Sequence, residues 1–124
     1  MLSEADRAQG NRVQNTLDDN ILAPGWYRFH GAAGDGMADE CVLPNHCGTF
    51  YPGWLDGAHP TVAEGVVTRK LCFSKTDHCC WWSNNIKVKN CSSYYVYELQ
   101  KPPGQGFFRY CGNADTGKLH PISR

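Results

Sequence analysis

The stretch Asp77-His78-Cys79-Cys80-Trp81-Trp82, written DHCCWW, decides how the rest of the chain is interpreted. Successive side chains on a strand point to opposite faces, so Cys79 and Cys80 can tether one segment to two different neighbours. Trp81 and Trp82 would alternate likewise, with one ring inward against these tethers and the other outward. The doublet therefore favours a crossing of two disulfides.

Metal and redox sites are the alternatives for these cysteines. Zinc sites usually combine closely spaced Cys or His pairs, whereas the seven cysteines here are separated by 5, 24, 6, 0, 10 and 19 residues. One ion could hardly use both Cys79 and Cys80, and no C-x-x-C pair is present. We expect no metal and no cofactor. Three disulfides would leave one thiol over, and spacing alone does not choose the connectivity.

Composition indicates one small extracellular domain. The 124 residues carry 12 acidic and 12 basic side chains, which is unlike the basic footprint of a nucleic-acid binder. The chain has 13 Gly, 4 Trp, 6 Tyr and 5 Phe but few aliphatic residues, so the core must depend on rings and cross-links. No apolar run is long enough to cross a membrane. The opening MLSEADRAQG is no secretory signal, so we expect a chain from which a signal has been removed.

The pattern along the chain predicts a mainly β, loop-rich single domain with a short helical or irregular N-terminal segment. Helical turns are expected at residues 3–9, and turns rather than regular structure at 41–63. Strands are expected at 26–29, 66–73 and 107–111, with a hairpin that joins 86–90 to 94–99. Trp26 and Phe29 should be at least partly core. Trp54, or one of Trp81 and Trp82, should be accessible to solvent.

Seven motifs together resemble one known family. GWYRFHGAAGDGM, CVLPNHCGT, PGWLDGAHP, EGVVTRKLCF, HCCWW, IKVKNC and YYVYELQKPP are similar to the uromodulin-type eight-cysteine domain. This family includes uromodulin, the pancreatic zymogen-granule glycoprotein and related invertebrate secreted proteins. The resemblance covers residues 25–112, which leaves an N-terminal extension at 1–24 that we expect to pack on the domain, and a polar tail at 113–124.

The resemblance implies a pairing scheme for the cysteines. Carried over position by position, the family pattern gives Cys41–Cys79, Cys47–Cys111 and Cys72–Cys80. The family partner of Cys91 has no counterpart in this chain, so Cys91 is expected to be free or bonded to another chain. The family's glycosylation sequon is also lost in the segment WLDGAHP, so a role that depends on that glycan is not transferred.

The family implies a non-catalytic extracellular binding or adhesion module, secreted or displayed on a cell surface. Candidate contact rings for a protein or glycan ligand are Tyr51, Trp54, Trp81 and Trp82. The alternative is a structural link in a secreted matrix or filament, with self-association through Cys91. A hydrolase is less favoured, because the acids Asp35, Asp39 and Glu40 lie in a glycine loop and no G-x-S-x-G elbow accompanies the histidines. No nucleic-acid partner and no membrane insertion are expected.

Overall fold

The computed structural model describes residues 2, 19, 22–44, 46, 47, 49, 51–100 and 108–114. These residues form one six-stranded sheet and two short 3₁₀ turns. The strands are β1 (Gly25–Tyr27), β2 (Tyr51–Asp56), β3 (Val66–Lys75), β4 (His78–Asn90), β5 (Tyr95–Leu99) and β6 (Phe108–Tyr110), and the turns are η2 (Gly31–Ala33) and η3 (Val62–Glu64). The mainly β, disulfide-rich fold expected from the sequence is confirmed.

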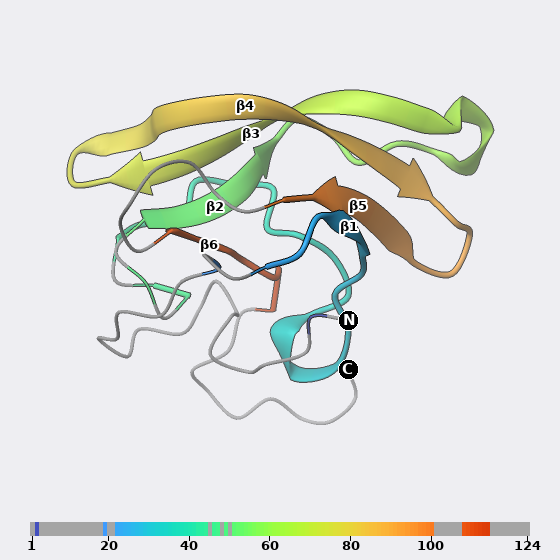
Figure 1. The fold of residues 1–124 in the computed structure, drawn as a ribbon, viewed down its shortest axis with the longest axis horizontal. Helices are drawn as coiled ribbons and strands as arrows, with labels where there is room; N and C mark the ends of the chain where they lie inside the picture. The colour runs from blue at the N-terminus through green and yellow to red at the C-terminus, as the bar shows by residue number, and fades with distance from the viewer. Residues whose placement is uncertain are drawn as a thin grey trace.

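The strand order β1-β5-β4-β3-β2-β6 places the long hairpin β3–β4 at the centre of the sheet. All neighbours are antiparallel except β2 and β6, which are parallel. The hairpin twists strongly, as sheets of L-residues do. At one end β4 therefore forms the rim above β3 and β2, and at the other end β5 and β1 continue the sheet beyond β4 (Figure 1).

The hairpin of β4 and β5 confirms the alternation expected over residues 86–99. Lys87 pairs with Glu98 and Asn90 with Tyr95. Ile86 and Val88 are buried, whereas the lysines that alternate with them are exposed. This alternation is what a strand with one face on the core requires.

Two apolar clusters hold the sheet. The main cluster lies on the face to which Leu71 and Phe73 contribute, and the second lies around Trp54 and Cys72. Residues 71–74 of β3 are all buried, so this part of the strand is covered on both faces. The main cluster comprises Leu2, Phe29, Ala33, Met37, Leu55, Leu71, Phe73, Ile86, Val88, Tyr97, Leu99, Phe108 and Tyr110.

Of the two predictions about the aromatic strand, one is confirmed and the other is wrong. Phe29 is 1% exposed and is confirmed as core. The prediction for Trp26 is wrong, because 46% of this residue is exposed. Strand β1 lies at the edge of the sheet, and its register pairs Trp26 with the exposed Glu98 and Tyr27 with the buried Tyr97. Paired residues share a face, so Trp26 points away from the core.

The expectation of turns throughout residues 41–63 is also wrong, because β2 lies within this segment. Pro52 and Gly53 resembled turn residues, but the pairing of β2 with β3 starts only at Gly53. The missing N–H of Pro52 therefore interrupts no bond to β3. Gly53 is required for packing, since a Cβ there would lie 2.7 Å from Phe73 Cε1.

Described residues of the N-terminal segment contact the sheet and its core. Leu2 is buried and forms a parallel bridge with Phe29. The Asp19 carboxylate accepts a hydrogen bond from the Tyr110 N–H at 2.8 Å. The helical turns expected at residues 3–9 and the tail after residue 114 lie outside the described residues. In the described part of the chain, no helix is long and apolar enough to cross a bilayer.

Candidate functional site

Both cysteines of the doublet are bonded within the chain. Cys79 is bonded to Cys41 and Cys80 to Cys72, with Cα–Cα distances of 5.6 and 4.9 Å. These are the pairs that the family resemblance implies. The doublet lies where the register between β3 and β4 shifts, so regular alternation does not hold there. Both bridges consequently lead to the cluster around Trp54, not to opposite faces of the sheet.

The indole of Trp54 reinforces this crossing. Trp54 Nε1 donates a hydrogen bond to the backbone carbonyl of Cys79 at 2.8 Å. Only 8% of Trp54 is exposed, because its ring packs among the cysteines of the second cluster. The structure therefore places Trp54 in the core and not among the solvent-facing contact rings.

The third bridge joins Cys47 to Cys111 over 64 residues of sequence, and Cys91 has a free thiol. Cys47 and Cys111 are fully buried, whereas Cys91 is partly exposed. The Cys91 N–H donates to the Tyr94 carbonyl at 2.7 Å in the connection between β4 and β5. The thiol thus lies at one end of this hairpin and is partly accessible.

Trp81 and Trp82 are both accessible, with 39% and 46% of their surfaces exposed. The expectation that one of them is buried is wrong. The Trp81 ring lies 5.2 Å from that of Tyr51 and 5.9 Å from that of Phe108, and Lys75 Nζ lies 4.8 Å from its centroid. These contacts fix Trp81 at the margin of the main cluster. Tyr51 is half-buried beneath it.

The two tryptophans lie on a strand edge that no described strand covers. Strand β4 pairs with β5 only over residues 87–90, whereas its pairing with β3 continues to His78. Over residues 82–86, which pair regularly with β3, alternate backbone groups of β4 point to the side away from β3, where no described strand pairs with them. Figure 1 shows this part of β4 at the rim of the sheet. Residues 79–86 contain no charged side chain. Exposed edges in native proteins are usually protected by charges, by proline or by a covering element. We call residues 79–86 the β4 edge.

The residues that sequence reasoning did not single out are His59 and Tyr97. The Met37 N–H donates to the Tyr97 hydroxyl oxygen at 2.7 Å. The hydroxyl oxygen also lies 2.7 Å from His59 Nε2, within hydrogen-bond distance, and His59 Nδ1 lies 3.5 Å from Asp39 Oδ2. Burial lowers the pKa of His59, although Asp39 opposes this effect. These residues lie far apart in the sequence, and no local pattern indicated that they would be in contact.

Asp35 and Asp39 of the glycine loop have structural partners, and Glu40 is exposed. Asp39 faces His59, and the backbone N–H of Asp35 donates to the side chain of Asn113 at 3.1 Å. Among the described residues, no group of three or more His, Cys, Asp or Glu side chains is arranged to hold a metal ion. This arrangement makes Asp35 and Asp39 part of loop packing.

Comparison with known proteins gives consistent matches. A model of the uromodulin-like eight-cysteine domain matches residues 27–112. The pancreatic secretory granule membrane major glycoprotein GP2 of Rattus norvegicus is 38% identical over 120 residues, which cover 94% of this chain and 22% of that protein. Uromodulin of Rattus norvegicus is 50% identical over 80 residues, 64% of this chain and 12% of that protein. GP2 of Canis lupus familiaris is 43% identical over 117 residues, 94% of this chain and 23% of that protein. The chain spans less than a quarter of the length of these relatives.

Proposed function

This chain belongs to the family of uromodulin-like eight-cysteine domains, and from that premise we propose that it is a non-catalytic binding module whose protein partner docks at the β4 edge. The domain is secreted or extracellular. Its three disulfides agree with this location, because disulfides persist in oxidising compartments.

The observation that carries the proposal is the β4 edge, which no described strand covers, beside two exposed tryptophans. An extended segment of a partner can add to such an edge by main-chain hydrogen bonds, and its alternate side chains then meet the flanking rings. Tryptophan is enriched at the energetic centres of interfaces, since it contributes a large, stiff contact area. Bridges at Cys79 and Cys80 hold the edge in place, so little conformational entropy is lost on binding.

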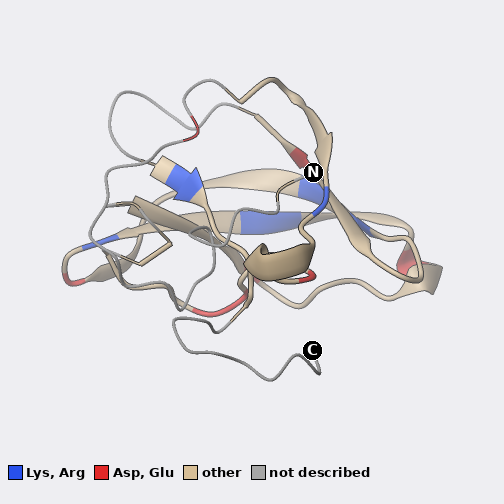
Figure 2. Ribbon diagram, turned by 90° about the horizontal axis from the view of Figure 1, so that it is seen from below, with Lys and Arg blue, Asp and Glu red and all other residues tan. Residues whose placement is uncertain are grey.

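The charges around the edge favour an acidic or neutral partner segment. Lys75 lies over Trp81 at one end of the edge, and Lys87 follows its other end. Figure 2 shows Lys and Arg along the described strands, and most of the Asp and Glu positions in turns and loops. An acidic segment laid along β4 would therefore meet the positive charge of Lys75 at the Trp81 end, whereas Lys87 at the other end lies opposite its cross-strand partner Glu98.

The environment of Tyr97 and His59 supports a module without catalysis. Tyr97 is fully buried, and burial raises the pKa of its hydroxyl, so this group is a poor nucleophile and a poor general acid. His59 is hydrogen-bonded to that hydroxyl, and its ring faces Asp39. The network links Asp39 and His59 to a hydroxyl that is itself buried, and we assign it to stability.

The test uses peptides displayed on phage, selected on the oxidised domain, and it maps the bound peptides by amide NMR. We expect the largest shifts and new exchange protection at residues 82–85. Ser83→Lys should abolish binding, because a charge on the edge opposes strand pairing. Ser93→Lys, which adds the same charge at an exposed position away from the edge, should bind normally.

Trp82→Ala should weaken the same peptides, whereas Val62→Ala, at another exposed apolar residue, should not. Peptides that bind equally well to Ser83→Lys would refute docking at the edge. Selective binding of glycans at Trp81 and Trp82, with no peptide binding, would refute a protein partner and indicate a carbohydrate ligand at the β4 edge instead.

A second candidate function is a covalent link between chains. The partly exposed free thiol of Cys91 favours it, because an accessible thiol can form a disulfide with a second chain. Non-reducing electrophoresis of the purified domain after mild oxidation tests this role. A dimer that is absent from Cys91→Ser supports the link, and a protein that stays monomeric under oxidation excludes it.

A further inference from the structure

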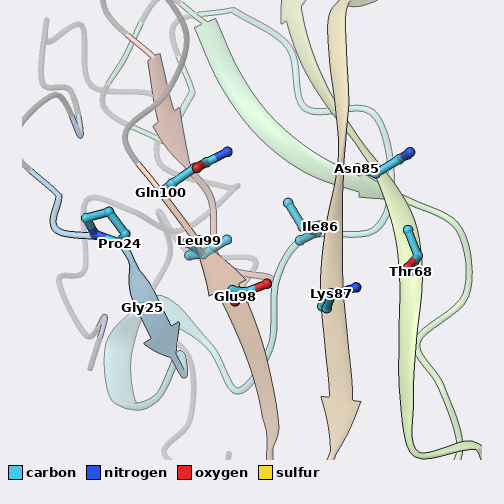
Figure 3. A pocket seen from close by; sticks show the side chains of 9 residues that line it. All are labelled: Pro24, Gly25, Thr68, Asn85, Ile86, Lys87, Glu98, Leu99 and Gln100. Atoms are coloured by element: carbon cyan, nitrogen blue, oxygen red, sulfur yellow. The ribbon is translucent and has the colours of Figure 1, made fainter.

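A separate cavity lies where β5 leaves β4. The pairing of these strands ends at Lys87 and Glu98, and beyond this pair the strands part. The gap holds a cavity of about 300 Å³, at the lower end of the range for ligand pockets. Figure 3 shows its lining residues, which are Pro24, Gly25, Thr68, Asn85, Ile86, Lys87, Glu98, Leu99 and Gln100. We call this cavity the β4–β5 notch.

The notch has an apolar base and a polar wall. Ile86 and Leu99 are 5% and 1% exposed and belong to the main cluster. The wall carries a hydroxyl, two amides, an ammonium and a carboxylate, from Thr68, Asn85, Gln100, Lys87 and Glu98.

The charges and hydrogen-bonding groups of these side chains indicate which class of ligand the notch can bind. Lys87 and Glu98 have opposite charges and are cross-strand partners, so the notch has no net charge to attract a phosphate or a carboxylate. Donors and acceptors are mixed, which suits hydroxyl groups because each hydroxyl both donates and accepts. A purely apolar ligand would leave these polar groups without partners, at a cost in free energy.

Trp26 provides an aromatic surface beside the notch. It follows the lining residue Gly25 and pairs across the strands with Glu98, so its ring projects on the same face as that carboxylate. The Trp26 side chain is 46% exposed and belongs to neither apolar cluster, so it has no role in packing the core. An indole offers a flat apolar face against which the C–H groups of a sugar ring can pack.

We propose that the β4–β5 notch, together with Trp26, binds a neutral sugar residue. The hydroxyls of the sugar bond to Asn85, Glu98 and Thr68, and one face of its ring packs on Trp26. The site is separate from the β4 edge and does not depend on the proposed function there. The sugar can be free or can be the end of a glycan chain, since both present the same hydroxyl groups.

The experiment titrates the oxidised, isotope-labelled protein with glucose, galactose, mannose and N-acetylglucosamine, each alone, and follows amide and indole NMR signals. An array of immobilised glycans distinguishes a free sugar from a chain end. At least one sugar should bind with millimolar affinity, which is usual for a shallow polar site, and should shift Thr68, Asn85, Glu98 and the Trp26 indole.

Trp26→Ala and Asn85→Ala should each weaken binding at least about tenfold, as expected when a central contact is removed. Leu43→Ala, which removes an exposed apolar side chain outside the notch, should leave the affinity unchanged. Native amide spectra of all three variants would show that the fold is kept. Absence of shifts with all four sugars and of binding on the array would overturn the proposal. Binding that survives Trp26→Ala and Asn85→Ala unchanged would also overturn it.

Discussion

His59 Nε2 lies 2.7 Å from the Tyr97 hydroxyl oxygen, and this contact ties the segment after β2 to the core side of β5. The same hydroxyl accepts a bond from the Met37 N–H, and the His59 ring lies 4.4 Å from that of Tyr95. Three segments far apart in sequence thus meet at one imidazole. The protonation state of His59 therefore affects the stability of the domain.

Stability should fall as the pH drops through about 6.5, the ordinary pKa of histidine. Burial lowers the pKa of His59 in the folded protein, so below pH 6.5 the unfolded chain binds a proton more readily than the folded one. Well above that pH, His59 is neutral in both the folded and the unfolded protein, so its protonation no longer makes the free energy of unfolding depend on pH. Urea unfolding between pH 5 and 8, roughly the range over which histidine titrates, measures this dependence. His59→Gln should flatten it, whereas the exposed His78→Gln should not.

Trp26→Ala should lower the free energy of unfolding by no more than about 1 kcal/mol, because the side chain is half exposed at an edge strand. Phe29→Ala should cost about 3–5 kcal/mol, because this ring is buried against Tyr97. Chemical denaturation of the two variants compares them directly. Equal losses of stability would contradict the assignment of Trp26 to the surface.

Gly112→Ala should destabilise the domain by about 2 kcal/mol or more, because a Cβ there would clash with the backbone oxygen of Ala33. A backbone atom cannot move aside as a flexible side chain can. Gly25→Ala is the matched control, since its Cβ would meet nothing within 4 Å. Thermal unfolding of both proteins should show a loss confined to Gly112→Ala.

Removal of the Cys47–Cys111 bridge should cost more than removal of Cys72–Cys80. The first closes 64 residues of sequence and the second 8, so loop entropy gives about 4 against about 2.5 kcal/mol. Paired Cys→Ala variants avoid new polar groups at buried sites. Cys91→Ala is the control that keeps all bridges, and its stability should be close to that of the parent chain. Equal losses for the two bridges would show that loop length does not govern their contribution.

The sequence predicted the strands that have a clear alternation. Ile86 and Val88 alternate with lysines, so both the hairpin and its buried face followed from the pattern. Trp26 and Tyr27 are both aromatic, so the pattern could not tell which ring faces the core. Only the position of β1 at the edge of the sheet decides that.

The candidate site was predictable only in part. Trp81 and Trp82 were named from residue type, but their exposure depends on the register shift next to the doublet. The burial of Trp54 depends on its contact with the Cys79 carbonyl across the sheet. The β4–β5 notch arises because two strands part after Lys87 and Glu98, and no local residue pattern encodes where a ladder ends.

The central claim is that the DHCCWW doublet is the crossing of two intrachain bridges, and mapping of disulfides by mass spectrometry tests it most directly. The native protein is alkylated and digested with trypsin without reduction. One linked assembly should contain the peptides 29–69, 71–75, 76–87 and 110–118. Peptide 90–109 should appear alone, with Cys91 alkylated. Fragmentation between Cys79 and Cys80 should assign Cys41 to the first and Cys72 to the second. Recovery of Cys91 in an intrachain bridge, or a free thiol at either cysteine of the doublet, would contradict the account.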